Sequence, residues 1–71
     1  MKIVLLYQGH KYHVAKDETI SSAEFRELFD EIVDYVGKGN VESMSCKDES
    51  MNQVWLPKRA LQNAVWRLDE D

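Results

Sequence analysis

The sequence predicts an α+β fold, in which two β-hairpins form a small antiparallel sheet and one amphipathic helix packs on a face of it, followed by a short C-terminal helix or strand. Three observations support this prediction. Apolar residues form strand-length runs near the N-terminus and again in the second half of the chain, a capped segment with helical spacing lies between them, and turn residues separate the runs into pairs. With 71 residues, the chain has room for a single domain with one shallow core.

The first predicted hairpin lies at the N-terminus. The run KIVLLY at residues 2–7 has the length and the β-branched content of a strand that is buried on both faces, so we expect a central strand. Gln8, Gly9 and His10 supply a turn in which a residue can adopt positive φ. Residues 11–16 then alternate polar and apolar side chains, as the return strand of a hairpin does.

The helix that follows has the clearest start signal in the chain. Ser21 and Glu24 have the spacing of a capping box, in which each side chain accepts a hydrogen bond from the other residue's backbone N–H. Ile20 and Phe25 occupy the two positions of a hydrophobic staple, which fixes how the chain enters the helix. The helix is therefore predicted to begin at Ser21.

The same helix is predicted to extend to residue 36, with Gly37 as the residue that ends it. Its apolar residues follow the spacing i, i+3, i+4, i+7, i+8 and i+11, which places them on one stripe. We expect this stripe to be the main contributor to the core, and Phe29→Ala to cost about 3–5 kcal/mol. The stripe consists of Phe25, Leu28, Phe29, Ile32, Val33 and Val36.

The second predicted hairpin is weaker in its pattern. Residues 41–47 alternate serine with Met44 and Cys46 and lack a strongly hydrophobic face, which is typical of an edge strand. A charged turn over residues 47–50 leads to a partner strand at residues 53–56. Pro57 ends that strand because it has no N–H to donate.

The C-terminal segment has two interpretations. Pro57 suits the first position of a helix, and five apolar residues keep helical spacing, so one helix over residues 57–69 is favoured. The alternative is a short helix over residues 57–63, a turn at Asn63 and a final strand over residues 65–68. Both interpretations leave the fold class unchanged.

The composition is that of an ordinary folded domain, with 44% hydrophobic and 31% charged residues. No apolar run approaches the length of about 20 residues that spans a membrane, and the N-terminus lacks the apolar core of a signal peptide. The single Cys46 excludes an intramolecular disulfide, so we expect a cytoplasmic protein. The small size favours a binding module or a homodimer over an enzyme.

Catalytic and cofactor motifs are absent from the sequence. It contains no glycine-rich phosphate loop, nucleophile elbow, HExxH helix or EF-hand loop. His10, His13 and Cys46 are the nearest to metal ligands, but their spacing matches no zinc module, and the two histidines should face opposite sides of a strand. Cys46 with a histidine base is the one nucleophilic pair to consider, and nothing in the sequence lowers the pKa of that thiol. We expect neither enzyme activity nor a bound cofactor or metal.

The helix carries the whole excess of negative charge. Residues 21–36 hold one arginine, Arg26, against five acidic residues, a net charge of −4 that equals the net charge of the chain. Like charges at i, i+3 and i+4 repel, so this arrangement does not stabilise the helix. We expect the acidic residues to dock a basic protein partner or to mimic nucleic-acid phosphates, and the alternative is a face that only keeps the protein in solution. They are Glu24, Glu27, Asp30, Glu31 and Asp34.

A second surface is suggested by aromatic and basic residues near the C-terminus. Two tryptophans and three cations can form a platform for single-stranded nucleic acid, although the chain is acidic overall and carries no nucleic-acid-binding motif. Binding of single-stranded nucleic acid is therefore the alternative function, and a protein partner is the one we expect. The tryptophans suit a core or the centre of a homodimer interface better. These residues are Trp55, Lys58, Arg59, Trp66 and Arg67.

The segment VWLPK, residues 54–58, resembles the strand-to-turn segments of short phage and prophage proteins. The resemblance implies a small accessory or inhibitory protein and assigns no role to any residue. Together with the acidic helix, it leads us to expect a non-enzymatic module that binds another protein and regulates or inhibits it.

Overall fold

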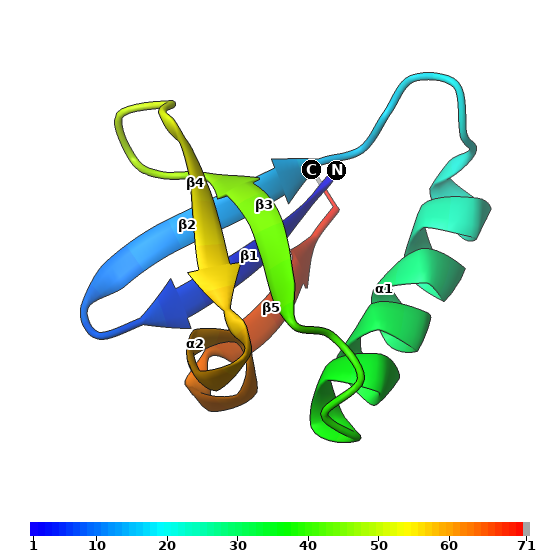
Figure 1. Ribbon diagram of the computed structural model, residues 1–71. Helices are drawn as coiled ribbons and strands as arrows, with labels where there is room; N and C mark the ends of the chain where they lie inside the picture. Colours follow the sequence, from blue (N-terminus) through cyan, green and yellow to red (C-terminus); the bar gives the residue numbers. More distant parts are fainter. Residues whose placement is uncertain (71) are drawn as a thin grey trace.

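The computed structural model describes residues 1–70 and confirms the α+β fold (Figure 1). A five-stranded antiparallel sheet is accompanied by two helices, and the sheet is open. In chain order the elements are β1 (Lys2–Tyr7), β2 (His10–Ala15), α1 (Ser22–Gly37), β3 (Ser43–Lys47), β4 (Gln53–Pro57), α2 (Lys58–Asn63) and β5 (Val65–Asp69).

The order of the strands across the sheet is β4-β3-β2-β1-β5. β1 pairs with β2 from Lys2↔Ala15 to Tyr7↔His10, and along its other edge it pairs with β5. The two hairpins are joined much less firmly, because β2 and β3 pair only at His13↔Lys47. Beyond that pair the hairpins separate, and in Figure 1 β3 and β4 run steeply across the direction of β1 and β2.

The first hairpin is confirmed, with a tighter turn than expected. Gln8 and Gly9 both have positive φ, 50° and 78°, so the loop is a two-residue type I′ turn and β2 begins at His10. Both faces of β1 are buried from Ile3 to Leu5, whereas Leu6 is 37% exposed. The expected two-sided burial therefore holds for the middle of the strand and fails near its end.

The hydrophobic core lies on one face of the sheet. Ile3 and Leu5 of β1 contribute to it from the sheet, and Leu61 of α2 is fully buried against them. Phe25 and Val36 bring the two ends of α1 into the same cluster. The helices and the first hairpin are thus held together by one continuous core.

The start of α1 is confirmed at atomic detail. Ser21 is the N-cap, its hydroxyl accepts a hydrogen bond from the Glu24 backbone N–H at 3.1 Å, and Glu24 Oε1 accepts one from the Ser21 N–H at 3.1 Å. Ile20 and Phe25, the two staple residues, both join the core cluster. The local sequence alone therefore determines where this helix begins.

The burial expected for α1 is wrong in part. Of the six residues in the predicted stripe, only Phe25 and Val36 are buried. Leu28 is 39% exposed, and the other three are half-buried. The middle of the helix packs on the core less closely than its two ends, because Phe29 and Ile32 contact the core cluster but remain partly exposed.

The end of α1 also differs from the prediction. Gly37 is the last helical residue, and Gly39, with φ 75°, adopts the left-handed conformation two residues later. The Gly39 N–H donates to the Val36 carbonyl at 3.0 Å, and the Asn40 N–H donates to the Tyr35 carbonyl at 2.9 Å. This pair of hydrogen bonds is a Schellman motif, which requires the glycine at position 39 and not at position 37.

The two glycines are therefore expected to respond in opposite ways to alanine. Gly37→Ala should stabilise the protein by about 0.5–1 kcal/mol, because position 37 is helical and a Cβ there meets no atom within 4 Å. Gly39→Ala should destabilise it by about 1 kcal/mol, because alanine is strained at φ +75°. Urea unfolding of the two variants measures the difference, and equal effects would contradict the assigned helix end.

The second hairpin is confirmed, but its edge strand was assigned to the wrong segment. β4 lies at the edge of the sheet, whereas β3 lies between β4 and β2 and begins at Ser43 rather than residue 41. Pro57 is the last residue of β4 and precedes α2 as its N-cap, a position one residue earlier than expected. A proline is tolerated there because an edge strand has a free side that needs no donor.

The C-terminal segment follows the alternative interpretation, and the favoured single helix is wrong. α2 ends at Asn63, Ala64 is extended, and β5 fills the open edge of β1. The Trp66 indole N–H donates to the Leu61 carbonyl at 2.9 Å, which fixes the turn between α2 and β5. β5 pairs with β1 at five positions, from Lys2↔Asp69 to Leu6↔Val65, and this pairing with a distant strand overrides the local helical pattern.

Candidate protein-binding site

The acidic residues of α1 lie on its solvent-exposed face, and three of them surround a groove. The groove has a volume of about 260 Å³ and runs along the first half of the helix. Its apolar part is formed by Ile20 and Leu28, and the carboxylates stand beside them. The residues that line it are Ile20, Glu24, Glu27, Leu28 and Glu31.

Helical spacing explains how these side chains come together. Positions 24, 27, 28 and 31 are separated by three or four residues and therefore lie on one face of a helix. Ile20, in the segment before the helix, is held beside that face because it packs on the core. The sequence pattern assigned Leu28 to the core, so Leu28 was missed as part of the site. Glu24 and Glu31, which lie next to it along the helix face, were a signal that it is exposed.

Of the five acidic side chains, two already have a hydrogen-bond or ion-pair partner within the protein. Glu24 caps the helix, and the hydrogen bonds from the backbone and side chain of Ser21 lower the pKa of Glu24. Asp34 forms an ion pair with Lys38 at 2.9 Å, and this contact raises the pKa of Lys38. The sequence interpretation missed Lys38 as a partner because it ended the helix at residue 36.

The remaining three carboxylates, on Glu27, Asp30 and Glu31, form no ion pair within residues 1–70. Arg26, the one basic residue amid them in the sequence, is directed to the C-terminal segment. Its Nε donates to Glu70 Oε1 at 3.0 Å, which raises the pKa of Arg26 and lowers the pKa of Glu70. Three negative charges on α1 are thus left without a cation beside them.

Four carboxylates that accept hydrogen bonds or form ion pairs in the folded protein determine how its stability changes at acidic pH. Their pKa values are lowered in the folded protein, so the unfolded chain binds more protons as the pH falls. The contribution of these groups to the free energy of unfolding should be fully present above the ordinary carboxyl pKa values of 3.8 and 4.5. It should be lost as the pH falls through the lowered pKa values of the folded protein. Thermal unfolding followed between neutral and acidic pH tests this, and a melting temperature that rises on acidification would contradict it. The groups are Asp17, Glu24, Asp69 and Glu70.

The aromatic and basic residues of the C-terminal third do not form one surface. Trp66 points to the core, whereas Arg67 lies on the opposite face of β5 and bonds to Asp69 at 2.8 Å. Trp55 is 66% exposed on β4, at the other edge of the sheet. Lys58 pairs with Glu42 at 2.8 Å at the start of α2.

These five residues, which include the exposed Arg59 of α2, are therefore divided among three elements and two faces. Of the two indole rings, that of Trp55 is exposed and that of Trp66 packs against the core, so within residues 1–70 they do not form a stacking platform.

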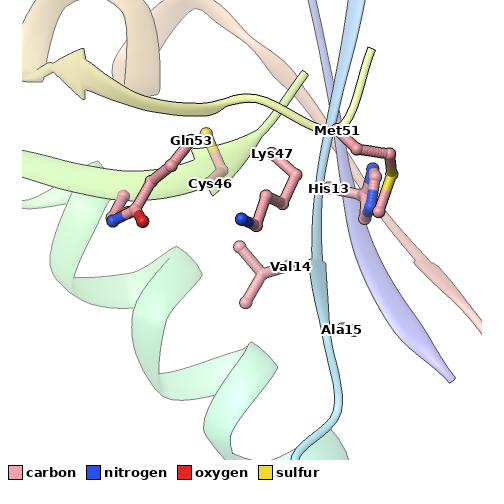
Figure 2. Close-up of a pocket in the computed structure, with 8 residues that line it drawn as sticks. His13, Val14, Ala15, Cys46, Lys47, Met51 and Gln53 are labelled. Carbon is pink, nitrogen blue, oxygen red and sulfur yellow. The ribbon is translucent and has the colours of Figure 1, made fainter. Parts of the chain in front are cut away.

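The histidines and the cysteine are also separated. His10 lies opposite Tyr7 and His13 opposite Val4, so they face different sides of the sheet as expected. His13 and Cys46 line the same groove between β2 and β3, but Figure 2 shows them on different sides of it, with Lys47 and Val14 between. Burial raises the pKa of the Cys46 thiol, whereas a cysteine nucleophile needs a lowered one.

Two further features of residues 1–70 bear on the site. In this part of the chain, no three His, Cys, Asp or Glu side chains gather closely enough to hold a metal ion. Neither helix in the same range has the length and apolar character needed to cross a membrane.

Comparison with known proteins adds no further constraint. No protein-family model, no curated protein and no solved structure matches the chain. The geometry of the chain itself is therefore the basis for a functional proposal.

Proposed function

We propose that this protein is a non-enzymatic module that binds another protein through the groove on α1. The observation that carries the proposal is the exposed side chain of Leu28 beside the carboxylates of Glu27 and Glu31, which have no cation partner within residues 1–70. An apolar contact surrounded by one sign of charge is suited to a basic segment that also presents an aliphatic or aromatic side chain.

The proposed mechanism is occlusion of a basic surface on the partner. Complementary charge accelerates the encounter, and burial of Leu28 and Ile20 slows dissociation. Such a module regulates or inhibits its partner by covering the surface, as expected of a phage-type accessory protein. The free thiol of Cys46 supports a cytoplasmic setting for this activity.

A homodimer is the second arrangement that an observation supports. Trp55 is 66% exposed on β4, and β4 has an unpaired edge that a second copy could extend. This contact would lie away from α1 and leave the groove free for its partner.

The proposal is tested by capture from a nuclease-treated lysate of the source cells. Wild-type protein and the variant Glu27→Lys/Glu31→Lys serve as baits in parallel. We expect a protein that the wild type retains and the variant releases, with a basic surface at the contact. Equal recovery by both baits would mean that the acidic face of α1 only solvates the protein.

A further inference from the structure

A second groove lies where the two hairpins separate. β2 and β3 pair only at His13↔Lys47, and beyond this pair a groove of about 380 Å³ opens between them. Its volume lies within the range of small-molecule sites, at the lower end. The groove is separate from the groove on α1, since no residue lines both.

The walls of this groove are apolar and its rim carries hydrogen-bond donors. Val14, Ala15, Cys46 and Met51 supply the apolar surface. The register places His13, Lys47 and Gln53 opposite one another on three neighbouring strands, so their side chains share one face of the sheet.

The charge around the groove has one sign. No Asp or Glu lines it, and within residues 1–70 Lys47 has no ion-pair partner. Figure 2 shows the Lys47 side chain extending into the space between β3 and β2, with its ammonium above Val14. A desolvating apolar wall strengthens the attraction of such a cation for an anion.

The loop from β3 to β4 holds Met51 at the groove. Met51 has φ 66°, a conformation that costs free energy for a residue with a side chain, and it is 62% exposed. Asp48 fixes the loop, because its Oδ1 accepts hydrogen bonds from the N–H groups of Ser50 and Asn52, both at 2.9 Å. A flexible thioether is therefore kept in the open beside an apolar wall, where it can pack on a ligand.

We propose that this groove binds a small organic carboxylate with an apolar body. The apolar part would contact Val14, Ala15 and Met51, and the carboxylate would accept hydrogen bonds from Lys47, with His13 and Gln53 beside it. Such a site would be independent of the protein-binding function proposed for α1.

The test uses indole-3-acetate and its neutral amide, indole-3-acetamide, as matched probes. Each is titrated into the isotope-labelled full chain, and backbone amide shifts are followed by NMR. We expect saturable shifts at Val14, Cys46 and Lys47, and an affinity at least about tenfold higher for the acid than for the amide. Equal affinity for the two probes, no saturation at millimolar concentrations, or shifts elsewhere in the chain would overturn the proposal.

Two lysine variants complete the design. Lys47→Met keeps the length of the side chain and removes its charge, and it should reduce the affinity for the acid about tenfold while leaving the affinity for the amide unchanged. Lys38→Met removes a charge that is also exposed, at the C-cap of α1, and should bind the acid as the wild type does. An equal loss in both variants would show that net charge alone attracts the probe, and this too would overturn the site.

Discussion

Phe25→Ala is expected to destabilise the protein by about 3–5 kcal/mol, which would leave it largely unfolded at room temperature. Phe25 is 2% exposed and joins the first turn of α1 to the core formed by Ile3, Leu5 and Leu61. Removing its ring leaves a cavity between the helix and the sheet that so small a core cannot close.

Phe29→Ala is the matched control, with the same chemistry one turn further along the helix. The sequence pattern predicts an equally large cost for it, but Phe29 is only half-buried, so a smaller loss of about 1–2 kcal/mol is expected. Urea unfolding followed by circular dichroism measures both costs. A cost for Phe29→Ala as large as that for Phe25→Ala would contradict the half-buried position of Phe29.

The second large effect concerns the groove on α1. Glu27→Lys/Glu31→Lys is expected to weaken binding of the captured partner at least about 100-fold, because two attractive charges become two repulsive ones. Most of the loss in association rate should disappear at high ionic strength, where screening removes long-range steering.

Leu28→Ser separates the apolar contribution from the electrostatic one. Leu28 is 39% exposed in the free protein, so the substitution should affect stability little and instead accelerate dissociation of the partner. Surface plasmon resonance at two salt concentrations distinguishes the two mechanisms. An unchanged dissociation rate for Leu28→Ser would exclude this side chain from the contact.

Local signals in the sequence predicted those parts of the fold that depend on adjacent residues. The capping box of Ser21 and Glu24 and the turn at Gly9 are such cases, because the groups that satisfy the backbone lie within a few positions. Gly37 was assigned as the helix end for the same local reason. That assignment failed because a second glycine, Gly39, competes for the same role and forms the better motif.

The features that the sequence missed, or that it gave only as an alternative, depend on residues far apart in the chain. β5 forms because the outer edge of β1 is open to it, and nothing within residues 57–69 reveals that edge. Leu28 was assigned to the core because spacing identifies a stripe but not the width of the surface it meets. The site on α1 was therefore predicted in its carboxylates and missed in its apolar part, Ile20 and Leu28.

The most direct test of the protein-binding groove is the affinity of the captured partner for two variants that carry the same net charge. Glu27→Lys/Glu31→Lys reverses charges in the groove, and Glu18→Lys/Glu49→Lys reverses two exposed charges outside it. Binding that is lost in the first variant and retained in the second is the result we predict. Equal weakening of both would show that the partner responds to overall charge and that the groove on α1 is not its docking site.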